Sequence, residues 1–365
     1  MSDEPDEIEE AEEQAAGGEV PPPRANPEFS GHPAAEAALL GAYRSGRLPH
    51  AWLITGPRGV GKATLAFRFA RFLFAQGAAG GALFAAPPAS LFIAADDPAF
   101  RRVASGGHPD LLVVERGFDP RRRRLRSEIV VADTRAIAGF LRLTPAEGGW
   151  RVVVLDGADA MNRNASNALL KILEEPPERA VLLLVSDNPG RLLPTIRSRC
   201  RRLALRPLPE ALIEEALRRY RPDLPAADAG ALARLAEGSI GRALALASSG
   251  GLELYRNLSS LLERLPEIDD EALHGFADGV LRGEGEDRFA LLGELLPGWL
   301  AHMVTRAAAG TAGEGTMRLA QRRSLDQWVE VWENLTHLFA EADSINLDRK
   351  QVVLNAFFAL EAAAR

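Results

Sequence analysis

Residues 56–63 match the phosphate-binding loop pattern G-x-x-x-x-G-K-[ST] at every position except the last. Glycines allow backbone N–H groups to converge on phosphate oxygens, and Lys62 would reach the β- and γ-phosphates of a nucleotide. The last position normally carries a hydroxyl that binds Mg²⁺, which the methyl group of Ala63 cannot do. Thr64 follows, but one residue along a helix turns a side chain by about 100°, so its hydroxyl should point away from the metal. We predict retained phosphate binding with poor hydrolysis; the alternative is a loop kept only for packing.

An acidic residue ends the predicted strand at 151–155, where nucleotide hydrolases with this loop place a Mg²⁺-binding acid. That residue is Asp156, and in active enzymes a glutamate that polarises the attacking water often follows it. Here Gly157 follows instead, and Asp159 fits a helix N-terminal acid better than a displaced base. Because a general base contributes about 10²–10⁴-fold in rate, we expect negligible turnover.

The next predicted strand, at 181–185, should end in a polar residue that senses the γ-phosphate. Asp187 stands there, and its carboxylate would repel a phosphate unless a cation intervened or the side chain turned to solvent. The predicted nucleotide site, for ATP or ADP held weakly, comprises Gly56, Pro57, Arg58, Gly59, Val60, Gly61, Lys62, Ala63, Thr64, Asp156 and Asp187.

Arg199 belongs to the run Arg-Ser-Arg-Cys at 197–200, between a predicted helix and the last strand. An arginine at the edge of such a domain can reach a neighbour's nucleotide, where an arginine finger supplied in trans contributes about 10³–10⁵ in rate. Spacing alone favours the alternative, a solvated surface arginine.

Alternating strands and helices must position these residues. Each strand is a continuous apolar run, which predicts a parallel α/β sheet. The predicted strands are 51–55, 111–114, 151–155, 181–185 and 202–205, with a short extended piece at 129–131. The predicted helices are 33–44, 63–74, 164–175 and one that begins at Thr134. From about residue 209 onward the period is helical, with a plausible linker at 248–251 and helices at 325–339 and 351–360.

The charge of the chain is concentrated at its N-terminus. Residues 1–20 carry nine acids and no Lys or Arg, and removing these nine from the total of 50 leaves 41 acids against 43 bases. This acidic stretch should be a disordered tail. The chain has no apolar run of membrane-spanning length, no secretory signal pattern and one cysteine, Cys200, which excludes an internal disulfide and a multi-cysteine zinc site.

Two segments of the α/β region carry no regular period. Residues 75–107 are rich in Ala, Gly and Pro, and we expect a loop insertion or weak helices there. Residues 121–126 hold five arginines, which could contact nucleic acid or form a solvated hairpin tip.

The run NASNALLKILEEPP at 164–177, followed by LLPTIRSRC at 192–200, resembles the clamp-loader AAA+ ATPases of bacterial DNA replication. The resemblance covers roughly residues 28–250. It implies an AAA+ P-loop α/β domain at 26–208 after the tail at 1–25, a helical lid domain at 209–250 and an all-α collar domain at 251–365.

Within that family the chain resembles the non-motor delta-prime class. The motor class, gamma/tau, would have a Ser or Thr at Ala63, a Glu at Gly157 and a lid arginine at Gly241, within the run Gly-Ser-Ile-Gly at 238–241. The run His-Pro-Asp at 108–110 is also similar to a short delta-prime signature. Many relatives bind zinc through a cysteine cluster before that run, but residues 75–107 contain no cysteine, so zinc is not expected.

The resemblance implies that Arg199 is an arginine finger inserted into an adjacent motor subunit. It further implies a ring with gamma/tau and delta subunits that loads a sliding clamp onto primed DNA, little ATPase activity of the chain itself, membership of the DNA-directed DNA polymerase holoenzyme, and a cytoplasmic, nucleoid-associated location. An active ATPase motor that uses Thr64 and Asp159 as substitutes is the alternative. A stand-alone DNA-binding module is a third interpretation.

Overall fold

The computed structural model describes residues 20–78, 87–119, 124–147, 149–248, 250–282, 285–310, 312–344 and 347–365. The chain forms two compact units, one that ends at Leu244 and one that spans Ala245–Arg365. The finer division into tail, α/β, lid and collar domains stays a prediction.

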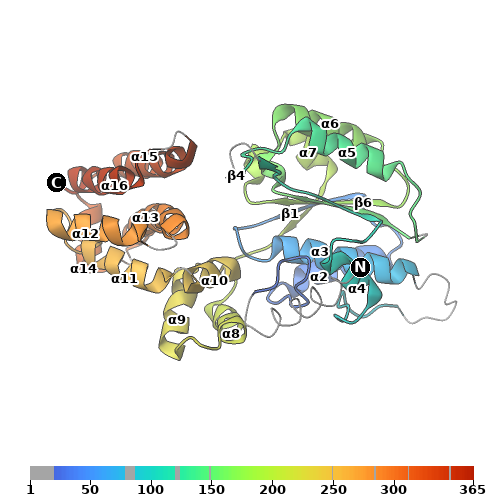
Figure 1. Ribbon diagram of the computed structural model, residues 1–365, viewed down its shortest axis with the longest axis horizontal. Coiled ribbons are helices and arrows are strands. Elements are labelled where there is room, and N and C mark those ends of the chain that lie inside the picture. Colours follow the sequence, from blue (N-terminus) through green and yellow to red (C-terminus); the bar gives the residue numbers. More distant parts are fainter. Residues whose placement is uncertain are drawn as a thin grey trace, which may run out of the picture. The chain divides into compact units, whose positions relative to one another are not determined.

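A five-stranded parallel sheet organises the first unit (Figure 1). Its order is β2-β5-β6-β1-β7, which places β1 in the interior between β6 and β7. The register sets Thr55 opposite Ser186 and Ala204, so that the carboxyl ends of three strands meet at one edge. The strands are β1 (Ala51–Thr55), β2 (Leu111–Val114), β5 (Arg151–Asp156), β6 (Ala180–Ser186) and β7 (Arg201–Ala204).

Helices cover both faces of this sheet, as expected for strands that are apolar on both sides. Figure 1 shows α2, α3 and α4 on one face and α5, α6 and α7 on the other. The helices are α2 (Pro33–Arg44), α3 (Lys62–Ala78), α4 (Pro98–Ala104), α5 (Val131–Leu141), α6 (Arg163–Glu174) and α7 (Pro194–Arg199).

Helix α6 illustrates why the sequence folds locally in this way. The side chain of Asn162 caps its first turn by accepting a hydrogen bond from the Ala165 N–H at 3.0 Å. Leu169, Ile172 and Leu173 recur at helical spacing and are buried in the core between α6 and the sheet.

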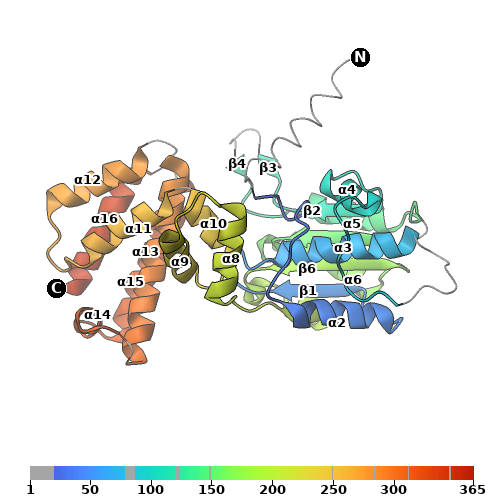
Figure 2. The same cartoon turned by 90° about the horizontal axis from the view of Figure 1, so that it is seen from below.

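Among the described residues after β7, the regular elements are helices, which confirms the predicted fold class of a parallel α/β region followed by helical regions. Helices α8 (Glu210–Tyr220), α9 (Ala226–Leu235) and α10 (Ile240–Ser248) come first. The second unit contains α11 (Gly251–Leu262), α12 (Asp270–Leu281), α13 (Gly285–Ala308), α14 (Glu314–Ala320), α15 (Leu325–Ser344) and α16 (Arg349–Ala364). Figure 2 shows α13 and α15 side by side, where Leu296 and Leu335 are buried. Within the described residues, no helix combines the length and apolarity needed to cross a membrane.

Several predicted bounds were wrong. The extended piece at 129–131 makes only an isolated bridge from Ile129 to Met161, because α5 already begins at Val131 rather than Thr134. The Asp133 carboxylate, which accepts from the Val130 N–H at 2.9 Å, fixes this early start. In the insertion, α3 continues to Ala78 and α4 forms at 98–104, whereas residues 79–86 lie outside the described part of the chain.

The basic segment is only partly described. The short strands β3 (Phe118–Asp119) and β4 (Arg124–Leu125) pair antiparallel on either side of it, while residues 120–123 lie outside the described residues. Arg126 pairs with Asp133 at 3.3 Å, so this arginine has an internal carboxylate partner. Contact with DNA here stays a prediction.

Candidate functional site

The phosphate-binding loop leaves the carboxyl end of β1 and runs into the first turn of α3, as its motif requires. Gly56 has a φ of 147°, and a Cβ atom there would lie 2.5 Å from the Leu205 carbonyl oxygen. Only glycine fits this backbone, because the chain turns sharply beside the end of β7. The glycine that the sequence motif requires at position 56 is thus also required by the packing of the loop against β7.

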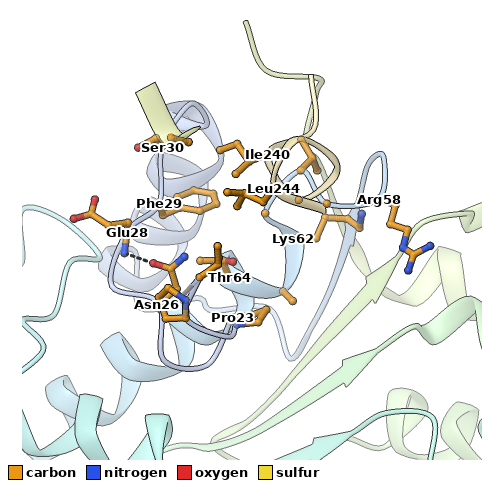
Figure 3. A pocket seen from close by; sticks show the side chains of 18 of the residues that line it. Pro23, Asn26, Glu28, Phe29, Ser30, Arg58, Lys62, Thr64, Ile240 and Leu244 are labelled. Atoms are coloured by element: carbon orange, nitrogen blue, oxygen red, sulfur yellow. Dashed lines mark hydrogen bonds between the residues drawn. The ribbon is translucent and has the colours of Figure 1, made fainter. Parts of the chain in front are cut away.

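A cavity of about 600 Å³ lies beside the loop (Figure 3). The predicted residues that line it are Arg58, Gly59, Val60, Gly61, Lys62, Ala63, Thr64, Asp156 and Asp187. Gly56 and Pro57 do not line it, although their carbonyl groups bind Lys62. Thr64 lines the cavity together with Pro23 and Asn26, so its hydroxyl faces the same space as Lys62 even though it is displaced from the Ala63 position.

The ammonium group of Lys62 is bound entirely within the chain. Its Nζ atom lies 2.8 Å from the Gly56 oxygen, 2.5 Å from the Pro57 oxygen and 2.7 Å from Asp187 Oδ1. The lysine side chain is 4% exposed, whereas that of Asp187 is 50% exposed. The Asp187 carboxylate is therefore half exposed to solvent and at the same time pairs with the loop lysine.

Asp156 lies at the end of β5 beside two other carboxylates. Burial raises its pKa above the ordinary value, Glu115 and Asp187 raise the pKa further, and Lys62 opposes them. Glu115 was missed by sequence reasoning. Its signal was available, because it directly follows β2, the strand that pairs with β5.

We expect Asp156→Asn to stabilise the chain near neutral pH. Because the pKa of Asp156 is raised by folding, the wild-type chain loses stability as the pH rises from about 4, the usual pKa of aspartate, through that raised value. Asparagine does not ionise and escapes this loss. Urea denaturation at pH 7 and at pH 4 should give a larger gain in free energy of unfolding at pH 7. An equal or reversed gain would contradict the assignment.

The Asp159 carboxylate binds backbone groups from a distant part of the chain. Its two carboxylate oxygens accept from the N–H groups of Asp187 and Asn188, at 3.2 and 3.3 Å. These bonds tie the short turn at 158–160 to the end of β6. The carboxylate is thus engaged by backbone donors after β6 rather than by the N–H groups of its own turn.

The segment at 238–241 lies directly on the phosphate loop. Ser239 Oγ donates to the Arg58 oxygen at 2.8 Å, and the Gly241 N–H donates to the Gly59 oxygen at 2.9 Å. A Cβ atom on Gly241 would lie 2.8 Å from the Gly59 Cα atom. Arg242 instead pairs with Glu237 at 3.0 Å. Gly241 therefore contacts the Gly59 backbone so closely that no larger residue fits at this position.

The segment 20–32 lies across α3 and α8. Arg71 donates to the Asn26 oxygen at 2.8 Å, Arg68 donates to the Pro27 oxygen at 3.0 Å, and the Tyr220 hydroxyl donates to Asn26 Oδ1 at 3.2 Å. Burial lowers the pKa of Arg71 to about 10. Residues 20–25, which the sequence placed in the disordered tail, are described here; residues 1–19 are not.

Arg199, the last residue of α7, does not line the chain's own cavity. Its guanidinium lies 2.8 Å from Glu174 Oε1 and donates to the Thr195 oxygen at 3.1 Å, and its side chain is 36% exposed. The adjacent Cys200 is buried, and burial raises the pKa of its thiol to about 12.

The run at 108–110 is part of the fold. His108 stacks on Phe74 with 3.7 Å between ring centroids. The buried Asp110 carboxylate accepts from the backbone N–H of Ala146 at 2.8 Å and of Glu147 at 3.2 Å. Among the described residues, no group of three or more His, Cys, Asp or Glu side chains is arranged to hold a metal ion.

Comparison with known families indicates which class of proteins with such a loop this chain resembles. Residues 31–209 match the family described as "DNA polymerase III, delta subunit". This part of the chain, about half of its length, is therefore similar to that family. The resemblance predicted from the sequence is thereby confirmed.

Curated relatives agree with this assignment. The chain is 42% identical over 191 residues to "DNA polymerase III subunit delta'" of Pseudomonas aeruginosa, covering 52% of this chain and 53% of the relative. It is 34% identical over 180 residues to the protein of that name in Bacillus subtilis, covering 49% of each. It is 32% identical over 266 residues to "DNA polymerase III subunit tau" of Escherichia coli, covering 70% of this chain and 38% of the relative.

The matches thus span about half or less of the length of these relatives. A solved gamma subunit-related protein of Thermotoga maritima is 22% identical, with a TM-score of 0.40, and the match covers 90% of this chain and 100% of that one. Identity is higher to the delta' proteins than to tau.

Proposed function

We propose that this chain is a non-motor subunit of a DNA polymerase III clamp loader, of the delta-prime class. It would supply Arg199 to the ATP site of a neighbouring motor subunit. The observation that carries this proposal is the position of Arg199, at the surface end of α7 and outside the chain's own phosphate cavity. A guanidinium so placed has no reactive group of its own chain to serve, but it can reach a second subunit.

The partly exposed Arg199 suits this task chemically. An arginine finger must offer a permanently charged, planar group with several donors to the phosphate oxygens of the transition state. Glu174 holds the guanidinium at 2.8 Å in a surface ion pair, a class of contact worth about 0–1 kcal/mol. A γ-phosphate, with more charge, can therefore displace Glu174 at small cost.

The chain's own cavity fits a nucleotide in part. The glycine-containing loop and the volume of about 600 Å³ suit the phosphates of ATP or ADP. The Mg²⁺ ligand is missing at Ala63, and Asp159 is bound to backbone donors. Lys62 and the loop N–H groups would hold any bound phosphate, while Gly157 supplies no carboxylate to activate water. We therefore propose a weak or degenerate nucleotide site without hydrolysis.

The proposed partners are the gamma/tau and delta subunits in a hetero-oligomeric ring in the cytoplasm, which loads the sliding clamp onto primed DNA. The test is ATP hydrolysis by the reconstituted ring with wild-type chain and with Arg199→Ala. The isolated wild-type chain should show no DNA-stimulated hydrolysis. Robust hydrolysis by the isolated chain that is lost on Lys62→Ala would instead establish an active motor that uses Thr64.

A further inference from the structure

The hydrogen-bonding capacity of Lys62 is fully used without a ligand. An ammonium group has three donors and no acceptor. Three oxygens lie within 2.8 Å of Lys62 Nζ: two belong to the loop backbone, at Gly56 and Pro57, and one belongs to the Asp187 carboxylate. A nucleotide phosphate can bind this lysine only by displacing one of the three.

The backbone holds Asp187 in place for this contact. Its own N–H and that of Asn188 donate to the two oxygens of Asp159, which fixes the turn after β6. The register sets Ser186, the residue before Asp187, opposite Thr55, the residue before the loop. The carboxylate thus reaches the loop because neighbouring parallel strands end together.

We propose that Asp187 is an internal ligand of the phosphate-binding loop: its carboxylate takes the bond that Lys62 would give to a nucleotide phosphate and thereby determines the low affinity of the cavity for nucleotides. The inference rests on the proposed function only in treating the loop as a phosphate site. Of the three acceptors, Asp187 alone is a side chain, and it is half exposed, so it can be removed without disturbing the loop backbone.

The test is calorimetric titration of the full chain with ADP in the absence of Mg²⁺, because Ala63 supplies no metal ligand. Asp187→Ala should bind ADP about tenfold more tightly than wild type, a difference that corresponds to about 1.4 kcal/mol. Asp187→Asn keeps an acceptor but loses the charge, so its gain should be smaller. The N–H bonds to Asp159 involve the backbone of residue 187 and survive both changes.

Glu115→Gln is the matched control. It removes one negative charge from the same cavity but leaves the three bonds of Lys62 in place, so its gain should be clearly below that of Asp187→Ala. In the double variant Lys62→Ala with Asp187→Ala, the gain in ADP affinity should disappear, because the Lys62 ammonium that Asp187→Ala would free is no longer present.

Equal ADP affinity of wild type and Asp187→Ala, including no measurable binding by either, overturns the proposal. So does an equal gain from Glu115→Gln, which would assign the effect to overall charge, or a gain that persists in the double variant. None of these outcomes bears on Arg199, whose role is read from hydrolysis at a neighbour's site.

Discussion

Replacing Arg199 with alanine should lower ATP hydrolysis at the adjacent motor subunit's site by about 10³-fold or more, because arginine fingers supplied in trans contribute about 10³–10⁵ in rate. The substitution removes only a surface ion pair with Glu174 from the chain itself. We therefore expect the thermal stability of the isolated chain to change little.

The measurement is single-turnover hydrolysis by a reconstituted ring in which only the neighbouring site is competent. Without that restriction, the other motor sites would mask the loss. Arg199→Lys should hydrolyse ATP at the neighbouring site hardly faster than Arg199→Ala, because an ammonium cannot reproduce the planar fork of a guanidinium.

Arg202→Ala is the matched control for charge. Arg202 is an exposed arginine on β7, three residues from Arg199 in the chain, so its loss removes one positive charge from an exposed site nearby in sequence. Hydrolysis should stay within a few-fold of wild type. An unchanged rate with Arg199→Ala, or an equal loss with Arg202→Ala, would refute the finger assignment. Glu174→Gln should leave the rate unchanged or slightly raised, because it frees the guanidinium.

The second large effect is expected at Gly241. Gly241→Ala should lower the free energy of unfolding by about 1–3 kcal/mol, because the added methyl group meets backbone that cannot move aside. Its Cβ atom would lie 2.8 Å from Gly59 Cα and 3.3 Å from the Gly59 oxygen. The same shift would strain the hydrogen bond from the Gly241 N–H to the Gly59 oxygen.

Urea denaturation of the full chain, followed by circular dichroism, measures this effect. Gly139→Ala in α5 is the control with the opposite sign: no atom lies within 4 Å of its Cβ position. It should stabilise the chain by about 0.5–1 kcal/mol, since alanine loses less backbone entropy than glycine in a helix. Stabilisation by Gly241→Ala would show that the contact with the loop is not made in solution.

These two positions differ in how much of their role the sequence revealed. Arg199 was identified from a contiguous run that resembles a family motif. Gly241 was recognised only as a missing arginine, and its contact with Gly59 was not predicted. A motif reports what chemistry a residue type can perform, but not which backbone lies against it.

Several features were predictable because they depend on short-range pattern. Residues 56–63 are contiguous, so the loop and its defect at Ala63 were visible directly. Four of the five sheet strands are apolar runs, and α6 has a strong helical period, so these elements were found within one or two residues. Element bounds failed where a cap decided them, as when Asp133 begins α5 three residues early.

The sequence by itself determined the family resemblance, the phosphate loop, the missing Mg²⁺ ligand and the arginine run at 197–199, because each lies in a few consecutive residues. Only the tertiary structure decided that Asp187 binds Lys62, that Glu115 lies near Asp156, and that Gly241 rests on the loop. Those pairs are far apart in the chain. The first two pairs meet because strand order and register bring distant strand ends to one edge of the sheet, whereas Gly241 reaches the loop from the start of α10.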